Sequence, residues 1–302
     1  MELRQLEIFV AVAKNLSFSK AAEEMYLSQS TVSLSIGSLE KDLKVQLFVR
    51  NTKEVSLTKS GVDLMAYAKK MLSLREQVIR EISLEDREAK GTIDIISSTI
   101  PAQHLLPEII SSFQKQWPNV IFHVDQADSR QVERVMGSFR YDFGMIGTSP
   151  DDLRFIHHPI FDDDLVLAMP VDSTESTEMI QKNFADYITK TPFIMREPGS
   201  GTRSEIEILL LKLGIEPKDM RNVAYFADTH SILLAVSSGM GVSLVSKTAT
   251  AMYTNSGLLR TIEMSNPFFK RQIHLLYNKE SLLSPLQEAF VEHAKKYYYY
   301  NN

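Results

Sequence analysis

The sequence contains no cysteine, and this absence excludes several kinds of chemistry. Without thiols the chain has no disulfide framework, no thiolate metal site and no cysteine nucleophile. It also has no apolar run that approaches the roughly 18 residues a membrane helix needs. The start, Met1-Glu2-Leu3-Arg4-Gln5, begins a charged amphipathic pattern and does not resemble a signal peptide. We therefore expect a cytoplasmic protein with no membrane partner.

An excess of positive charge is also missing. The formal net charge is -5 at pH 7, whereas a nucleic-acid-binding protein is more often basic overall. Any DNA binding must therefore come from a local arrangement of residues. The sequence also lacks a G-x-x-x-x-G-K phosphate loop, a nucleophile elbow and a metalloprotease helix. We expect no cofactor and no catalytic residue.

The first 90 residues divide into a compact unit and one long helix. Residues 1–58 carry short helical patterns, with Leu3, Leu6 and Phe9 on one apolar face. From Thr58 to about Lys90 a helical stretch without proline carries a single apolar stripe. Such a helix needs a partner surface, and a second copy of the chain supplies one, so we expect dimerisation. The alternative is a helix that packs on its own chain.

After Gly91 the pattern alternates between short apolar runs and amphipathic segments. Strands are predicted at Thr92–Ser97, Val120–Val124, Phe143–Ile146, Leu165–Met169, Pro192–Met195, Val223–Phe226, Gly241–Val245 and Gln272–Tyr277. Helices are predicted at Gln103–Gln116, Arg130–Phe139, Glu178–Ile188, Glu205–Leu213, His230–Ser237 and Pro285–Lys296. This alternation predicts an α/β sheet with helices on both faces, and its length suggests two lobes.

The segment from Ser19 to Ser33 has the form of a helix, a tight turn and a second helix. Ser19 and Ser28 stand where N-caps are expected. On the second helix Val32, Ile36 and Leu39 share one side. The opposite side is small and rich in hydroxyls, where a solvated helix more often carries Glu and Lys. We interpret this side as a surface for the DNA major groove, and the alternative is a helical packing module.

The predicted contacts follow from the chemistry of the exposed side chains. Gln suits adenine, hydroxyls suit bases or phosphates, and leucine suits a thymine methyl group. The segment "FVRNTKEVSLT" resembles a two-stranded wing, at Phe48–Arg50 and Val55–Leu57, that would contact phosphates. The predicted DNA-binding residues are Ser28, Gln29, Ser30, Thr31, Ser33, Leu34, Lys41, Arg50, Thr52 and Lys53.

Several strand ends in the α/β region lead into hydroxyl-rich helix starts. "SSTIPAQHLLP", "REPGSGTR" and "FADTHSILLA" have this form, and "MIGTSP" adds a threonine at a strand end. Glycines permit close backbone approach, and helix N-termini carry partial positive charge, so these places favour an anion. Taken alone, each is equally consistent with a simple helix cap. The predicted effector-binding residues are Ser98, Thr99, Ile100, Pro101, Thr148, Ser200, Gly201, Thr202, Arg203, Thr229 and His230.

One cluster, "HHPIFDDD", raises the question of a metal site. Adjacent histidines in an extended segment point to opposite faces, so His157 and His158 do not easily bind one ion together. We interpret the cluster as a surface or hinge segment and predict no metal.

The run "LEIFVAVAKNLSFSKAAEEMYLSQSTVSLSIGSLEKDLKVQLFVR" through "LTKSG" resembles the winged helix-turn-helix of LysR-type transcriptional regulators. The length of the chain and its later α/β region also resemble that family. Three positions depart from its pattern: Ser30 stands where proline is usual, Leu34 where arginine is common, and Lys44 where glycine is usual. These departures affect the base contacts and leave the module intact.

The resemblance implies an α+β multi-domain fold. It comprises a winged helix-turn-helix at 1–58, a linker helix at 59–90, and two lobes like those of periplasmic binding proteins at 91–163 plus 266–302 and at 164–265. It also implies a homo-oligomer, dimer or tetramer, on double-stranded promoter DNA, with RNA polymerase as a further partner. "REPGSGTR" is most similar to the branch that responds to sulfur oxyanions and metabolites of cysteine synthesis and carbon fixation, which implies a small anionic metabolite or inorganic anion as effector.

The rival interpretation is a two-lobed binding-fold enzyme or solute-binding protein with an accessory helical domain. An enzyme would need a general acid and base facing the cleft, and His230, Glu197 and Asp228 are the evident candidates. A secreted carrier would need a signal peptide.

Overall fold

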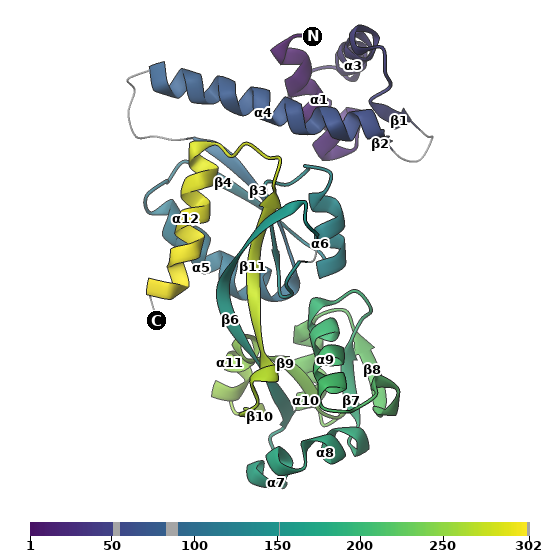
Figure 1. The fold of residues 1–302 in the computed structure, drawn as a ribbon, viewed down its shortest axis with the longest axis vertical. Coiled ribbons are helices and arrows are strands. Elements are labelled where there is room, and N and C mark those ends of the chain that lie inside the picture. Colours follow the sequence, from purple (N-terminus) through teal and green to yellow (C-terminus); the bar gives the residue numbers. More distant parts are fainter. Residues whose placement is uncertain (51–54, 83–89, 151, 301–302) are drawn as a thin grey trace.

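The computed structural model describes residues 1–50, 55–82, 90–150 and 152–300. The N-terminal helices and wing lie along one long helix, and the two lobes of the α/β region follow it in an elongated arrangement (Figure 1). Within the described residues, every helix is too short or too polar to cross a membrane.

The N-terminal unit is a helical core with a two-stranded wing. Its elements are α1 (Leu3–Asn15), α2 (Phe18–Glu24), α3 (Gln29–Leu43), β1 (Phe48–Arg50), β2 (Val55–Leu57) and α4 (Lys59–Ile82). Val32, Ile36 and Leu39 of α3 are fully buried, as their spacing predicts, and they pack with side chains of α1 and α4. The wing prediction is confirmed, since β1 and β2 pair antiparallel.

Local hydrogen bonds fix the ends of these elements. Ser28 caps α3 as predicted, because its side chain accepts from the Thr31 backbone N–H at 3.1 Å. The prediction of Ser19 as a cap is wrong: α2 begins at Phe18, and Ser17 accepts from the Lys20 backbone N–H at 3.3 Å. The buried carboxylate of Glu40 accepts from the backbone N–H groups of Leu47 and Phe48 and so holds the first wing strand against α3.

A seven-stranded sheet runs through both lobes. Its strand order is β10-β6-β11-β5-β3-β4, with β9 also paired to β6. The strands are β3 (Gly91–Ser97), β4 (Val120–Gln126), β5 (Phe143–Ile146), β6 (Phe155–Pro170), β9 (Ser243–Ser246), β10 (Leu259–Ile262) and β11 (Lys270–Asn278). The strands β6 and β11 are long and antiparallel, and they connect one lobe to the other (Figure 1).

The first lobe packs helices on both faces of β3, β4 and β5. Its helices are the π-helix η1 (Pro101–Leu105), α5 (Leu106–Gln114), α6 (Ser129–Met136) and α12 (Pro285–Tyr300). Ile95 faces the core that α5 and α12 cover, and Ile96 faces the opposite core with α6. This alternation is the period of two expected for a strand covered on both sides.

The second lobe is built from the parallel pair β7 (Phe193–Arg196) and β8 (Asn222–Phe226), with β9 and β10 on the end of β6. Its helices are α7 (Thr177–Lys182), α8 (Phe184–Lys190), α9 (Gly201–Lys212), η2 (Pro217–Asp219), α10 (Thr229–Ser237), α11 (Lys247–Asn255) and η3 (Pro267–Phe269). Two apolar clusters, on opposite sides of the strands, form its core.

Several secondary-structure predictions differ from the structure, among them the helix predicted at Gln103–Gln116, which is η1 followed by α5. The single helix predicted at Glu178–Ile188 is wrong, because the chain turns at Asn183 and forms α7 and α8. The strand predicted at Leu165–Met169 is only the last part of β6, which begins at Phe155 and carries the run Asp162 to Asp164 in its middle. The elements α11 and β10 were not predicted, and they lie in a stretch of weak apolar periodicity.

Candidate functional site

The outer side of α3 is the candidate DNA interface. Gln29, Ser30 and Lys41 are exposed, and Leu34 is 75% exposed. Thr31 is also exposed and Ser33 is half-buried. The Oγ of Ser28 lies 2.8 Å from that of Ser30 and 2.7 Å from the Oγ1 of Thr31, so these hydroxyls are organised before any ligand binds.

The departure at Lys44 has a structural consequence. Lys44 ends α3 in the left-handed conformation, with φ 56°, which glycine adopts most readily. The turn therefore forms here with a side chain, at some cost in strain. In the wing, the backbone of Arg50 pairs with that of Val55. Thr52 and Lys53 lie outside the described residues.

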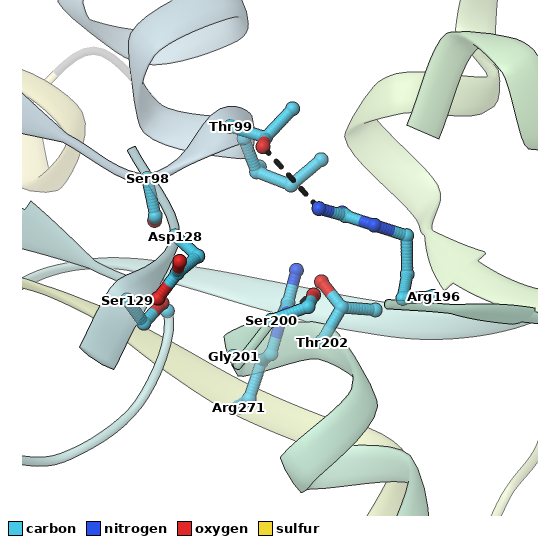
Figure 2. A pocket seen from close by; sticks show the side chains of 11 residues that line it. Ser98, Thr99, Asp128, Ser129, Arg196, Ser200, Gly201, Thr202 and Arg271 are labelled. Atoms are coloured by element: carbon cyan, nitrogen blue, oxygen red, sulfur yellow. Dashed lines mark hydrogen bonds between the residues drawn. The ribbon is translucent and has the colours of Figure 1, made fainter. Parts of the chain in front are cut away.

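A pocket between the lobes is the candidate effector site. Side chains from both lobes surround it, and its centre holds a space of about 10 Å³, roughly that of one water molecule. The lining residues are Ser98, Thr99, Ile100, Asp128, Ser129, Gly147, Arg196, Ser200, Gly201, Thr202 and Arg271 (Figure 2). The starts of η1, α6 and α9 contribute most of them.

Arg271 approaches the pocket from β11. Its side chain is 3% exposed and pairs with the fully buried carboxylate of Asp163 on β6, with Nε 2.9 Å from Oδ2. Its Nη1 donates to Thr202 Oγ1 at 3.0 Å. Its Nη2 lies 2.8 Å from the same Asp163 oxygen but makes no hydrogen bond with the described residues. Figure 2 shows the guanidinium directed into the pocket beside Ser200.

Arg196 approaches from the opposite side, at the end of β7. It is 3% exposed, and its Nε donates to Glu197 at 2.8 Å. Its Nη2 lies 3.5 Å from the hydroxyl of Thr99 in the other lobe (Figure 2), and its Nη1 donates to Thr229 at 3.2 Å. Arg196 therefore connects the two lobes at the back of the pocket.

Helix α9 begins in the pocket and meets the other lobe closely. Ser200 caps it, with its side chain accepting from the Arg203 backbone N–H. A Cβ on Gly201 would stand 2.5 Å from the Oγ of Ser129. A larger residue here would require the Ser129 hydroxyl to rotate and the contacts with Ser129 Cβ and Thr148 Cγ2, both at 3.3 Å, to lengthen. The free N–H groups of the first turn, with the partial positive charge of the helix, face the pocket.

The structure brings together six of the predicted effector-binding residues and separates the others. Ser98, Thr99, Ile100, Ser200, Gly201 and Thr202 line the pocket. Pro101 is buried within η1, and Thr148 faces an adjoining cleft. Thr229 contacts the pocket only through Arg196.

Arg203 and His230 point away from the pocket. Arg203 pairs with Glu207 at 2.7 Å and lies over the ring of Tyr225. This follows from helix geometry, because a residue two positions after Gly201 projects to another face of α9. His230 is exposed, and its ring lies 2.5 Å from the Tyr253 hydroxyl.

Sequence reasoning missed five lining residues: Asp128, Ser129, Gly147, Arg196 and Arg271. Asp128 and Ser129 had a usable signal, since "ADSRQ" after β4 is another strand end followed by a helix cap. Arg196 begins the quoted motif "REPGSGTR". Arg271 had no local signal, because β11 reaches the pocket only through the long pairing with β6.

Two half-buried ion pairs connect the first lobe to the N-terminal unit. Lys14 of α1 pairs with Asp94, and Lys69 of α4 pairs with Asp142 at 3.0 Å. Burial would raise the pKa of Asp142, but the charges of Lys69 and Lys14 lower it below its usual value. Phe139 of the first lobe packs within the core of the N-terminal unit. The DNA-binding unit is thus in direct contact with the lobe that carries half of the pocket.

Metal ligation has little support in the geometry. Across the described residues, histidine and acidic side chains form no group of three that would hold a metal ion. His157 instead lies with its Nδ1 3.2 Å from that of His274 on β11.

Comparison with known proteins gives concordant matches over the whole chain. Residues 3–62 match the family described as bacterial regulatory helix-turn-helix protein, lysR family. Residues 86–298 match the LysR substrate binding domain. A probable RuBisCO transcriptional regulator of Guillardia theta is 30% identical, covering 95% of this chain and 93% of that protein. The regulator CysL of Bacillus subtilis is 26% identical, covering 97% and 96%.

Solved structures share the fold. A full-length OxyR variant from Pseudomonas aeruginosa has a TM-score of 0.77 at 19% identity, covering 98% of this chain and 94% of that one. Full-length CbnR in complex with its target DNA has a TM-score of 0.58 at 21% identity, covering 98% and 99%.

Proposed function

The chain belongs to the LysR family of transcriptional regulators, and we propose that a small effector bound through an anionic group between its lobes modulates its binding to promoter DNA. The helix α3 enters the major groove with Gln29, Ser30, Ser33 and Leu34 toward the bases. The remaining predicted residues, Ser28, Thr31, Lys41, Arg50, Thr52 and Lys53, contact the backbone or position these side chains.

The observation that carries the anion proposal is the state of Arg271. Its Nη2 lies 2.8 Å from Asp163 Oδ2, an oxygen that Nε already contacts, and makes no well-directed hydrogen bond with the described residues. An acceptor in the pocket would satisfy this donor, which favours a ligand with an anionic group. The hydroxyls of Ser200 and Ser129 and the N-terminus of α9 converge on the same pocket. A hydrogen bond to a charged group contributes about 1.5–3 kcal/mol, so a few such donors give micromolar binding.

A sulfur oxyanion is the proposed anionic group. The space of about 10 Å³ admits neither ligand as it stands, and a compact tetrahedral group would require less separation of the lobes than a planar aromatic acid. The relatives named as RuBisCO regulators and CysL belong to the branch for which "REPGSGTR" suggested sulfur or carbon-fixation metabolites.

Transmission to the DNA-binding unit follows the contacts between the parts. A ligand that draws the lobes together acts on β6 and β11, and hence on the first lobe. The ion pairs of Lys14 and Lys69 with that lobe then change the position of the N-terminal unit. Coupling of this kind typically amounts to about 1–3 kcal/mol.

A homo-oligomer is proposed from the free face of α4. Tyr67, Met71, Leu74 and Val78 are exposed at helical spacing, and a second copy of α4 would bury them. We further propose that four copies assemble on DNA, that the assembly contacts RNA polymerase, and that the protein is cytoplasmic. The domain limits at 58, 90, 163 and 266 stay predictions, which limited proteolysis would test.

Titration calorimetry of the full-length protein tests the effector proposal. Sulfite, sulfate, thiosulfate and O-acetylserine are titrated into the wild type and into Arg271→Lys. The variant keeps the positive charge but loses the planar pair of guanidinium donors that can bind two oxygens at once. We expect at least one ligand to bind with micromolar affinity and to bind at least tenfold more weakly to the variant. The exposed Arg221→Lys is the control. If no anion binds while an uncharged metabolite does, the proposal is wrong.

A gel shift tests the regulatory part. DNA from upstream of the protein's own gene is titrated with and without the bound anion. We expect a change in affinity or in the mobility of the complex, because the effector alters the spacing of the DNA-binding units and the bend of the DNA. Identical complexes under both conditions would contradict regulation by that anion.

A further inference from the structure

The charges around the pocket do not favour a ligand that carries only negative charge. Arg196 has a carboxylate partner in Glu197, and Arg271 has one in Asp163. A third carboxylate, Asp128, lines the same pocket and has no ion-pair partner within the described part of the chain. With both arginines already balanced, Asp128 leaves the surroundings of the pocket formally negative.

Asp128 is placed against the opposite lobe. It caps α6, with Oδ1 accepting from the Gln131 backbone N–H at 2.9 Å. A Cβ on Gly199 would stand 3.2 Å from Oδ1 and 3.5 Å from Oδ2 of Asp128. The carboxylate therefore lies directly beside the loop that leads into α9. In Figure 2, Asp128 and Ser129 lie on one side of the pocket and Arg196 lies on the other.

The cleft that adjoins the pocket is lined by three carboxylates, Glu133, Asp152 and Glu205, and by one cation, Arg130. Ser129 and Gly201 line both spaces, and the cleft has a volume of about 510 Å³. Glu205, one turn into α9, also lines the cleft. Burial raises the pKa of Glu205 above its usual value, against the opposing charge of Arg271. A desolvated carboxylate gains from a nearby cation.

We propose that the effector is a small zwitterion, with its anionic group at Arg271 and the start of α9 and an ammonium group toward Asp128. This inference rests on the proposed function and narrows its ligand class. Arg271 Nη2 and the α9 N–H groups accept one anionic group, whereas Asp128 repels a second negative charge. An ammonium group would donate to the carboxylate of Asp128, which has no cation partner among the described residues. The adjoining cleft, which Glu205 also lines, has room for the carbon chain.

Matched pairs of probes test this ligand class on the full-length protein. Taurine and propane-1-sulfonate share the sulfonate and nearly the same length, and they differ by an ammonium in place of a methyl group. The pair β-alanine and butanoate repeats the comparison with a carboxylate. We expect calorimetry to show the amino compound of at least one pair binding at least tenfold more tightly than its partner, which equals about 1.4 kcal/mol.

The variant Asp128→Asn isolates the carboxylate. Asparagine caps a helix as well as aspartate does, so the fold is retained. We expect the advantage of the amino compound to disappear while the affinity for propane-1-sulfonate is unchanged or rises. Asp172→Asn, which removes an exposed carboxylate in the turn after β6, controls for net charge.

The outcomes separate the two proposals. Equal or tighter binding of propane-1-sulfonate, butanoate or sulfate to the wild type overturns the zwitterion and leaves the anion site standing. A tenfold advantage that survives in Asp128→Asn overturns the assignment to Asp128. No binding of any of these compounds, together with none of sulfite, sulfate, thiosulfate and the zwitterion O-acetylserine, overturns both proposals.

Discussion

Arg271 and Asp163 face each other across β11 and β6 as direct cross-strand partners, and their side chains form a buried ion pair. Asp163 stands where β6 leaves the sheet of the first lobe, since Leu165 already pairs with β9 of the second. Ser246 of the second lobe also donates to Asp163, at 2.7 Å. The pair thus joins the crossing strands, the second lobe and the effector pocket at one point.

Removing the charge of Asp163 is expected to destabilise the regulatory region strongly. Asp163→Asn leaves Arg271 as a buried charge without compensation, and breaking such a pair costs about 3–5 kcal/mol. Urea unfolding followed by circular dichroism measures the shift in midpoint. The neighbouring Asp162→Asn removes an exposed carboxylate on the same strand and serves as control. Equal midpoints for the two variants would contradict a structural role for the pair.

Gly201→Ala is expected to hold the lobes apart. Its methyl group would stand 2.5 Å from the Oγ and 3.3 Å from the Cβ of Ser129 in the other lobe. We expect at least tenfold weaker effector binding with an unchanged circular dichroism spectrum. Ser129→Gly removes both atoms together with a hydroxyl that lines the pocket, so the two changes are compared in a double-mutant cycle. Gly201→Ala should cost less affinity in the Ser129→Gly background than in the wild type, and an equal cost in both backgrounds would exclude the lobe contact as its cause.

The N-terminal unit was predictable because its signals are local. The spacing of Val32, Ile36 and Leu39 identifies the buried side of α3, and Ser28 identifies its start. Even here the cap at Ser17 was misplaced by two residues, because either serine satisfies the same helix-start pattern. Short-range sequence patterns therefore predict that a helix is present more reliably than they predict the residue at which it begins.

The pocket was only partly predictable because it is assembled from distant segments. The helix starts at Ser98 and Ser200 have visible cap and glycine patterns. Arg271 follows Ser200 by some seventy positions and reaches the pocket through strand register, which periodicity does not reveal. Asp163 was noticed only as part of an acidic run. Its role depends on a partner that the sequence does not identify.

Gln29 at the start of α3 is expected to contribute to base selection. A bidentate contact of glutamine with adenine discriminates by about 1–3 kcal/mol against the wrong base. Gln29→Ala should therefore reduce the preference for promoter DNA over random DNA and leave non-specific binding intact, as measured by competition gel shift. Gln116→Ala, at an exposed site on the first lobe, is the control. An unchanged preference would remove Gln29 from the base-reading surface.

His274 is expected to make stability depend on pH between about 6.5 and 4. It is buried, and burial together with the neighbouring His157 lowers its pKa to about 4. Below pH 6.5 the unfolded chain binds a proton at this residue, whereas the folded chain stays neutral until about pH 4. The contribution of neutral His274 to the free energy of unfolding is therefore fully present above about pH 6.5 and is lost as the pH falls toward about 4.

The variant His274→Gln tests this by removing the titrating group. The slope from one such histidine is at most about 1.4 kcal/mol per pH unit. Between pH 6.5 and 5 the wild type should lose stability more steeply than the variant, as measured by urea midpoints at each pH. Other half-buried histidines whose pKa burial lowers, His104 and His293, titrate in both proteins, so their effect cancels in the difference. His230→Gln removes an exposed histidine and controls for the loss of an imidazole elsewhere in the chain. Parallel curves for wild type and His274→Gln would show that His274 is not the source.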